Sequence, residues 1–542
     1  MLRTYITIAF RVLIKNKVFA GINILGLSAG IAFVLLIAAY SWSELQVNSV
    51  IKENDRVFLV QSKWKQADMG LDFTTLGPLT KTLKDEYPNL IEDQFHWDGI
   101  LSIVSKGDKH FRENLQLGDP SLLRMFGLPL LEGDANTALN NLDNIVITEN
   151  KAIKYFGRTN VIGETLTIQL FSGTKKDFII TGVLKNLPQN SVTQLVGDQN
   201  EIFFSDKALR FFGRDASFEQ WNNPYIAGYV KLKKGVRTAD LELPVKQVLK
   251  KYAPADIQQN LQVFFTPLSK YYLQSNNGLA GRMIYTLSFV ALFILLMAIV
   301  NFINISIGNS VSRLKEIGVR KVLGGMRKNL VLQFLAESFV LVFISMLLAL
   351  GIYQLARPLF GNFLGKQIPA LTDFPAVFAL VLLLLAVIIG MLAGLYPSLV
   401  LSAQPSVDSL KGKLKTVREK LVFRHSLLAL QFTIAIVVFI ASVVVSKQVS
   451  FFFSKNPGYE KEHVITAAIP RDWTLQGVRH LEVMRDAFTA LPQVSDASIS
   501  FEIPDGASGS TNNILYKASQ DSTKGIVAPS IICDEKYAAT YK

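Results

Sequence analysis

The run MIYTLSFVALFILLMAIVNFINISIGNSVS, residues 283–312, is followed directly by RLKEIGVRKVLGGMRK, residues 313–328. The first stretch contains no Asp, Glu, Lys or Arg, and the second contains six cations and one acid. A helix needs about 20 apolar residues to cross the hydrocarbon core of a membrane. The junction therefore predicts a membrane-spanning helix that ends in a basic loop.

Four further apolar runs have the length of a membrane span. They predict spans at residues 18–40, 329–356, 374–400 and 426–446. The first could instead be a cleaved signal peptide, but its 23 uncharged residues exceed a usual signal core and no A-x-A site follows. We therefore expect a retained anchor and a protein that crosses the membrane five times.

The net charge of +13 is concentrated in three short stretches beside these runs. Residues 1–17, 313–328 and 401–425 together hold 16 Lys or Arg and three acids, whereas residues 44–282 hold 28 and 27. Because basic loops stay in the cytoplasm, this asymmetry predicts a cytoplasmic N-terminus, a cytoplasmic loop at 313–328 and a cytoplasmic linker at 401–425. Residues 44–282 and the tail 447–542 are then predicted to lie outside.

The N-terminal residues 1–17 alternate apolar and basic side chains at helical spacing, which indicates a helix lying in the cytoplasmic interface. A frayed basic N-terminus is the alternative. The outer segment 44–282 mixes predicted strands at 56–61 and 178–184 with predicted helices at 79–86, 150–156 and 243–252. The expected fold class is thus a membrane protein with α-helical transmembrane spans and an α+β outer domain.

The chain also shows an internal repeat. A shift of 404 residues places the first span over the fifth and residues 87–92 over 491–496, where a helix candidate runs into a proline and a strand candidate follows. On this register residues 447–542 are the start of a second outer domain. We expect that domain to be incomplete, as in a fragment or a shortened gene product.

The sequence lacks the motifs that mark ATP-binding, zinc-protease and paired-cysteine sites. It contains no G-x-x-x-x-G-K-[ST] phosphate loop, no H-E-x-x-H and no C-x-x-C, the Ser-rich stretch at 506–511 lacks a G-x-S-x-G elbow, and the five histidines lack ligand spacing. The single cysteine, Cys533, excludes an intrachain disulfide. The cations flank apolar spans rather than a soluble face, so nucleic-acid binding is not expected. We predict no catalytic residue, no metal site and no cofactor in this chain.

The loop at 313–328 carries the most specific pattern. Val319, Val322 and Leu323 fall at i, i+3 and i+4 between cations, and Gly324-Gly325 supplies a helix stop. Such a helix could insert into a groove of a soluble partner. Ordinary positive-inside charge on a loop is the alternative.

This pattern, EIGVRKVLG at 316–324, resembles the coupling helix of the FtsX/MacB-type ABC transporter permeases. The resemblance extends to RVLIKNKVFAGINILGLSAG at 11–30, FGLPLLEG at 126–133, ITENKA at 147–152 and GLYPS at 394–398. It departs from the two-repeat members of the family, which carry a full second half.

The resemblance implies a permease subunit of the bacterial inner membrane with no ATPase domain of its own, whose outer segment is a MacB-like periplasmic core domain. A cytoplasmic ABC ATPase dimer would bind ATP, dock on the loop and drive movement of the periplasmic domain, which is mechanotransmission rather than passage through a channel. The family's coupling surface maps here onto Leu314, Glu316, Ile317, Gly318, Val319, Arg320, Lys321, Leu323 and Gly324. Membrane lipid is a further expected partner, together with a periplasmic partner or a second permease copy.

Two G-x-x-x-G pairs, Gly26 with Gly30 and Gly390 with Gly394, are candidates for close helix packing, although glycine is common in spans. A membrane-anchored regulator or receptor without transport would show the same topology and stays open as an alternative. A tethered cell-wall enzyme would need a catalytic cluster that the sequence lacks. Antimicrobial peptides, macrolide-like drugs, lipoproteins and control of cell-wall hydrolases are all compatible substrates or roles for an efflux-type member.

Overall fold

The computed structural model describes residues 2–65, 71–197, 199–310, 318–319, 321–323, 326–402, 417–454, 463–467, 469, 472–504, 511–515 and 526–541. Two compact units divide the chain: a helical unit of residues 1–46 and 276–455, and an outer unit of residues 47–275 and 456–542.

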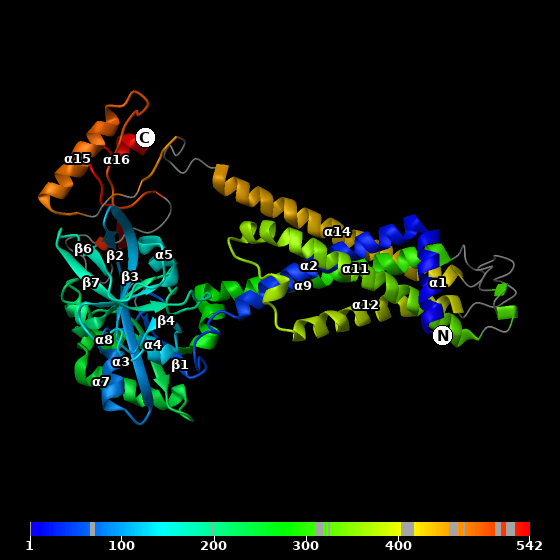
Figure 1. The fold of residues 1–542 in the computed structure, drawn as a ribbon, viewed down its shortest axis with the longest axis horizontal. Coiled ribbons are helices and arrows are strands. Elements are labelled where there is room, and N and C mark those ends of the chain that lie inside the picture. The colour runs from blue at the N-terminus through cyan, green and yellow to red at the C-terminus, as the bar shows by residue number, and fades with distance from the viewer. Residues whose placement is uncertain are drawn as a thin grey trace. The chain divides into compact units, whose positions relative to one another are not determined.

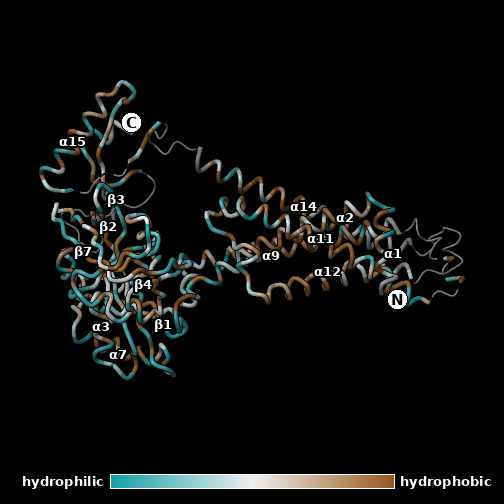
Figure 2. The backbone as a smooth tube through the Cα atoms, in the orientation of Figure 1, coloured by the Kyte–Doolittle hydropathy of each residue, from teal (hydrophilic) through white to brown (hydrophobic). Residues whose placement is uncertain are grey.

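The helical unit contains the apolar runs (Figure 1). Its helices are α1 Leu2–Lys15, α2 Lys17–Leu45, α9 Leu268–Ser310, α11 Arg327–Leu364, α12 Val377–Ser402 and α14 Val417–Ser454. Five of them, all except α1, are long and apolar enough to cross a membrane, and Figure 2 shows their hydrophobic colouring. The five predicted spans fall on these five helices, which extend beyond most of the predicted ends because the periodic backbone hydrogen bonds continue past the apolar stretch.

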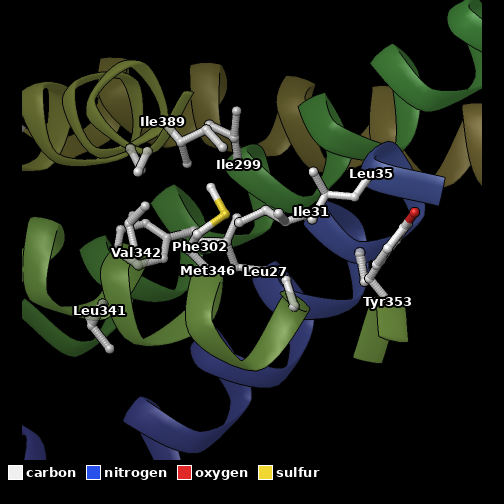
Figure 3. Close-up of a cluster of buried hydrophobic side chains, with 14 of the residues drawn as sticks. Leu27, Ile31, Leu35, Ile299, Phe302, Leu341, Val342, Met346, Tyr353 and Ile389 are labelled. Carbon is white, nitrogen blue, oxygen red and sulfur yellow. The ribbon is translucent and has the colours of Figure 1, made fainter. Parts of the chain in front are cut away.

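Aliphatic and aromatic side chains of α2, α9, α11 and α12 form the core of this unit. Figure 3 shows Leu27 and Ile31 of α2 beside Phe302 of α9 and Met346 of α11. Each of these four side chains is buried. Because these helices bury one another, the bundle is held by close packing of the spans rather than by the lipid around them.

Helix α1 is turned across the end of the bundle instead of continuing in line with α2 (Figure 1). Its Ala9 and Leu13 are buried, whereas Ile6, Phe10 and Ile14, each four residues apart, are exposed. A stripe of exposed apolar residues is what an interfacial helix at residues 1–17 requires, and the interfacial position itself stays a prediction.

Helix α9 contains an irregularity near its N-terminal end. Asn276, Asn277 and Gly278 have φ angles of 50°, 56° and 71°, which is left-handed backbone. The Nη2 atom of Arg282 donates to the carbonyl of Asn277 at 2.5 Å and so supplies a hydrogen-bond partner at the irregular turn. Asn and Gly are the residues that adopt this conformation at low cost.

The outer unit is built on a ten-stranded mixed sheet. Its strands are β1 Val57–Trp64, β2 Ile91–Lys106, β3 Lys109–Gly118, β4 Leu130–Gly133, β5 Asn144–Thr148, β6 Thr165–Gln169, β7 Lys175–Leu184, β8 Ile202–Ser205, β9 Ala227–Leu232 and β10 Leu261–Pro267. Their order is β10-β1-β9-β2-β3-β8-β5-β7-β4, with β6 pairing β2 and β7. Only β3 with β8 and β5 with β7 pair in parallel.

Short helices connect and cover these strands. They are α3 Leu79–Glu86, α4 Leu122–Phe126, α5 Glu149–Phe156, α6 Asp215–Glu219, α7 Glu242–Tyr252 and α8 Ala255–Asn260. Leu79 and Leu83 of α3 and Val248 of α7 share one buried cluster with strands β1 and β9. The α+β prediction is confirmed, and so are the predicted helices and strands of this domain to within three residues at each end.

The C-terminal part of the outer unit repeats a local arrangement of the first part. It contains α15 Leu475–Thr489, β11 Thr511–Leu515, β12 Ile526–Ser530 and α16 Tyr537–Tyr541. In the first part the Asp119 amide donates to the His96 carbonyl, and the His96 amide donates back to Asp119 Oδ2 at 2.7 Å. In the second part Asp534 and Ile499 exchange the same two bonds, both at 2.9 Å.

A short helix then begins three residues after each of these two aspartates, α4 at Leu122 and α16 at Tyr537. Ile499 lies 403 positions after His96, one fewer than the shift of 404 residues inferred from the sequence. Asp534 lies 415 positions after Asp119. The two parts therefore share this local arrangement, and a second, incomplete outer domain at 447–542 stays a prediction.

Candidate functional site

The described part of the predicted coupling loop is a short piece of helix. Gly318, Val319, Lys321 and Val322 have helical backbone, and the Leu323 amide donates to the Val319 carbonyl at 3.0 Å. The side chains of Val319, Val322 and Leu323 are 47%, 64% and 80% exposed. Three apolar groups at i, i+3 and i+4 thus share one open face.

The remaining residues predicted for ATPase coupling are not covered by the structure. Outside the described residues lie Leu314, Glu316, Ile317, Arg320 and Gly324. The apolar stripe is consequently the part of this surface that the structure places.

Two cations fix the loop to the end of α12. Lys321 Nζ donates to the Ser402 carbonyl at 2.7 Å, and Arg327 Nε donates to Ser402 Oγ at 3.3 Å. Ser402 is the last residue of α12 and is buried. Burial, and then the charge of Arg327, lower the pKa of Lys321. Since the last carbonyls of a helix lack partners and carry partial negative charge, these cations suit that end and join the loop to α12.

Close packing joins α2 to α9 at the first glycine pair. A Cβ atom on Gly30 would lie 2.9 Å from Ala298 Cβ, and one on Gly26 would lie 3.7 Å from Asn301 Nδ2. Only hydrogen fits at Gly30, because real Cβ atoms do not approach other carbons that closely. The two spans therefore pack closely at this point.

The second glycine pair lies between α12 and α11. A Cβ atom on Gly390 would lie 2.6 Å from Phe339 Cδ1, and one on Gly394 would lie 2.8 Å from Ser338 Cβ. Since α2 also packs against α11, the helices α2, α11 and α12 form a chain of contacts from the first span to the helix whose end binds the loop. Movement of one has to displace its neighbour, because packed helices have little free volume.

A buried asparagine fastens together the points where the chain enters and leaves the outer unit. Asn48 Nδ2 donates to the Leu268 carbonyl at 2.8 Å and to Ser191 Oγ at 3.1 Å, and Asn48 Oδ1 accepts from the Ser191 amide at 2.5 Å. Asn48 follows α2 by three residues, and Leu268 is the first residue of α9. The Asn48 clasp, meaning these three residues, therefore connects two of the chain crossings between the units to one loop of the domain.

The surroundings of the clasp make it rigid. Asn48 and Leu268 are fully buried, and Tyr229 of β9, also fully buried, donates its hydroxyl proton to the Ser191 carbonyl at 2.7 Å. Asn48 has a φ of 70°, in the left-handed region that few side chains adopt. No motif in the sequence indicated this residue; the only hint was an asparagine just beyond a helix end, where left-handed backbone is common.

A buried histidine and aspartate in the outer unit form a pair that could be mistaken for a catalytic dyad. His96 Nδ1 lies 2.5 Å from Asp119 Oδ2, and both side chains are buried. The repeated arrangement in the second part places Ile499 at the histidine position and keeps the aspartate as Asp534. Because the backbone bonds persist without an imidazole, this pair is structural. Among the described residues there is also no group of three His, Cys, Asp or Glu that could hold a metal ion.

Comparison with known proteins relates parts of both units to described protein families. Residues 20–248 match the family described as MacB-like periplasmic core domain, and residues 288–405 match the family described as FtsX-like permease C-terminal. The chain belongs to the FtsX/MacB-type permeases. It is an ABC transporter permease with a periplasmic-type α+β domain and several apolar helices.

Relatives of this permease include two macrolide export ATP-binding/permease proteins named MacB. The one from Neisseria gonorrhoeae is 25% identical over 254 residues, 46% of this chain and 35% of that protein. The one from Campylobacter fetus is 24% identical over 336 residues, 60% of this chain and 47% of that protein. The permease thus spans less than half the length of these relatives. The periplasmic region of MacB from Actinobacillus actinomycetemcomitans, a solved structure, matches 42% of this chain and 95% of its own, at 15% identity and a TM-score of 0.30.

Proposed function

We propose that this permease is the membrane subunit of an export-type ABC system, in which a separate cytoplasmic ATPase dimer moves the outer domain. The observation that carries the proposal is the exposed apolar stripe of Val319, Val322 and Leu323, on a helix joined to α12 through Ser402. Exposed apolar groups at helical spacing favour a protein partner. The chain contains no phosphate loop, so the ATP is expected on that partner.

The Asn48 clasp supports the mechanical part of the proposal. A shift of the spans would reach the outer unit through the segments that join the units, and the clasp holds two of these segments, at Asn48 and Leu268, to the loop at Ser191. The domain would then respond as one body instead of unravelling at one crossing. This role needs no substrate channel, and it assigns no particular substrate.

The topology that belongs to this proposal has the N-terminus and the loop in the cytoplasm of the bacterial inner membrane and the large domain in the periplasm. The single exposed cysteine, Cys533, tests it directly. A membrane-impermeant maleimide should label Cys533 in intact spheroplasts. In a Cys533→Ser background, Leu323→Cys should be labelled only after the membrane is opened, and labelling of Leu323→Cys from outside would reverse the topology.

The decisive functional experiment is coexpression with candidate ATPase subunits, followed by co-purification and vanadate-sensitive ATP hydrolysis in nanodiscs. Burying a leucine contributes about 1.5–3 kcal/mol, so Leu323→Asp should weaken ATPase binding about tenfold to a hundredfold. Leu243→Asp, at a leucine of α7 that is 64% exposed, is the matched control and should have no effect. Gly318→Pro and Glu316→Arg should also release or uncouple the ATPase.

The regulator alternative makes the opposite prediction for the same experiment. If the permease contacts envelope proteins without a motor, no ATPase will co-purify with it, and Leu323→Asp will leave its activity in cells unchanged. That pair of results would refute the proposed coupling.

A further inference from the structure

A cleft of about 820 Å³ opens in the helical unit beside the junction of α1 and α2. Its walls come from this junction, from α2, from α9 and from α14. The residues that line it include Lys15, Lys17, Ile22, Asn301, Asn304 and Leu428. None of them takes part in the coupling loop or the Asn48 clasp.

Asn304 gives the first indication of a ligand. Its side chain is 95% buried, since its exposed fraction is 5%, and neither Nδ2 nor Oδ1 has a hydrogen-bond partner in the described part of the chain. A buried amide without hydrogen-bond partners is unfavourable. Asn301, one helical turn earlier on α9, lines the same cleft and is half-buried. The two amides form a polar wall within an otherwise apolar span.

The charge at the mouth of the cleft is positive. Lys15 and Lys17 are exposed, and across the described ranges neither has an acidic partner. No Asp or Glu lines the cleft. Two ammonium groups without a counter-ion, close to hydrogen-bond donors, suit a phosphate group.

The depth of the cleft matches a lipid rather than a soluble anion. Ile22 lies five residues beyond Lys17 on α2, about 8 Å along the helix, and Leu428 of α14 adds a second apolar contact. Helix α1 exposes Ile6 and Phe10 on the side expected to face the membrane. The lysines therefore lie at head-group level, and the apolar walls lie at the level of the acyl chains.

We propose that this cleft binds one anionic phospholipid. Its phosphate lies between Lys15 and Lys17, its glycerol ester oxygens accept hydrogen bonds from Asn301 and Asn304, and one acyl chain follows Ile22. The lipid comes from the cytoplasmic leaflet, a statement that rests on the proposed topology, whereas the binding itself does not. By filling the space between the α1–α2 junction and α9, the lipid fixes the interfacial helix to the two spans that lead to the outer unit.

The test is native mass spectrometry of the full chain in detergent micelles, titrated with phosphatidylglycerol, phosphatidylcholine or glycerol 3-phosphate. We expect one phosphatidylglycerol to bind at least tenfold more tightly than phosphatidylcholine, with no competition by glycerol 3-phosphate. A lysine near a membrane surface contributes about 1 kcal/mol to anionic lipid binding, which is about fivefold. Lys15→Gln with Lys17→Gln should therefore reduce the affinity about 25-fold.

A matched variant distinguishes a specific lipid site from non-specific attraction of anionic lipid to the positive charge of α1. Arg11→Gln removes the same charge from α1 outside the cleft and should change the affinity less than twofold. Equal binding of the two lipids, or an equal loss with Arg11→Gln, would overturn the site. Effective competition by glycerol 3-phosphate would show a soluble-anion site and overturn the lipid assignment.

The variant Asn304→Leu distinguishes an empty cleft from one that binds a lipid. If nothing binds, removal of an unpaired buried amide should raise the melting temperature and leave phosphatidylglycerol binding unchanged. If the proposal is right, the variant binds phosphatidylglycerol at least fivefold more weakly and is no longer stabilised by it. All of these measurements omit the ATPase, so failure of the coupling proposal would not affect them.

Discussion

Replacement of Asn48 by alanine should loosen the outer unit at the place where the chain enters and leaves it. The substitution removes all three side-chain hydrogen bonds to Ser191 and Leu268. It also places an alanine at a φ of 70°, where an L-residue without a helpful side chain is strained. Both effects act on buried groups, so water cannot compensate for the lost partners.

The expected cost follows from these contacts. Three buried hydrogen bonds at about 1 kcal/mol each give about 3 kcal/mol, and left-handed backbone adds about 1 kcal/mol. A local loss of about 4 kcal/mol raises the population of the open clasp almost a thousandfold, since 1.4 kcal/mol is a factor of ten. Asn48→Gly removes the hydrogen bonds without the backbone strain and should therefore cost about 3 kcal/mol.

Hydrogen–deuterium exchange of the full chain in nanodiscs measures this directly. Peptides that cover residues 47–56, 186–195 and 265–272 should exchange at least a hundredfold faster in Asn48→Ala. The control is Asn186→Ala, because Asn186 Nδ2 also donates to a side chain, Asn150 Oδ1 at 3.0 Å, but at the surface. Its exchange should stay close to wild type.

A specific result would refute this reasoning. If Asn48→Ala changes exchange at Ser191 and Leu268 by less than fivefold, about 1 kcal/mol, the clasp does not hold the two crossings together. Faster exchange of equal size in Asn186→Ala would show that the effect is general to amide substitutions in this domain.

Three further outcomes can be measured on the purified permease. Gly30→Ala should lower the melting temperature in micelles by an amount equivalent to about 1–3 kcal/mol, because its methyl group meets the facing alanine of α9, whereas Gly21→Ala, with nothing within 4 Å, should be neutral or stabilising. Lys366→Met should cost about 2–3 kcal/mol in the same melting assay, because it leaves the buried Glu44 carboxylate without its ion pair, and adding Glu44→Gln should restore most of the loss. Burial raises the pKa of Glu113, but hydrogen bonds from two lysines outweigh it and hold the pKa below the usual 4.5; the outer unit should therefore lose stability as pH falls below about 4.5, and Glu113→Gln should flatten that part of a urea-denaturation profile against pH.

Much of the architecture could be predicted from local signals. Five apolar runs and three basic stretches predicted the spans, because transfer of charge into hydrocarbon costs so much that charged residues are rare within spans and gather beside them. Helix α3 was predicted at its observed bounds, 79–86, since its amphipathic residues are followed by Pro88, which a helix cannot continue through. Such features depend on residues close together in the sequence.

The features that depend on distant residues could not be predicted. The order of the ten strands, with β1 between β9 and β10, reflects the packing of segments about 170 and 200 residues apart. Asn48 and Leu268 are 220 residues apart, and neither belongs to a motif. The loop at Val319 carried a family pattern, but its attachment to Ser402 needs the fold of α12 to be known.

The left-handed run at Asn276, Asn277 and Gly278 means that α9 is not a uniform rod. Regular α-helix resists bending because each peptide is tied to the next turn, and three residues of opposite handedness interrupt that continuity. The interruption falls at the division between the two units. A pull along α9 would still reach Leu268, because the chain is covalently continuous, whereas a twist would be partly absorbed at this swivel. The movement proposed above would therefore pass through α9 as tension better than as torque.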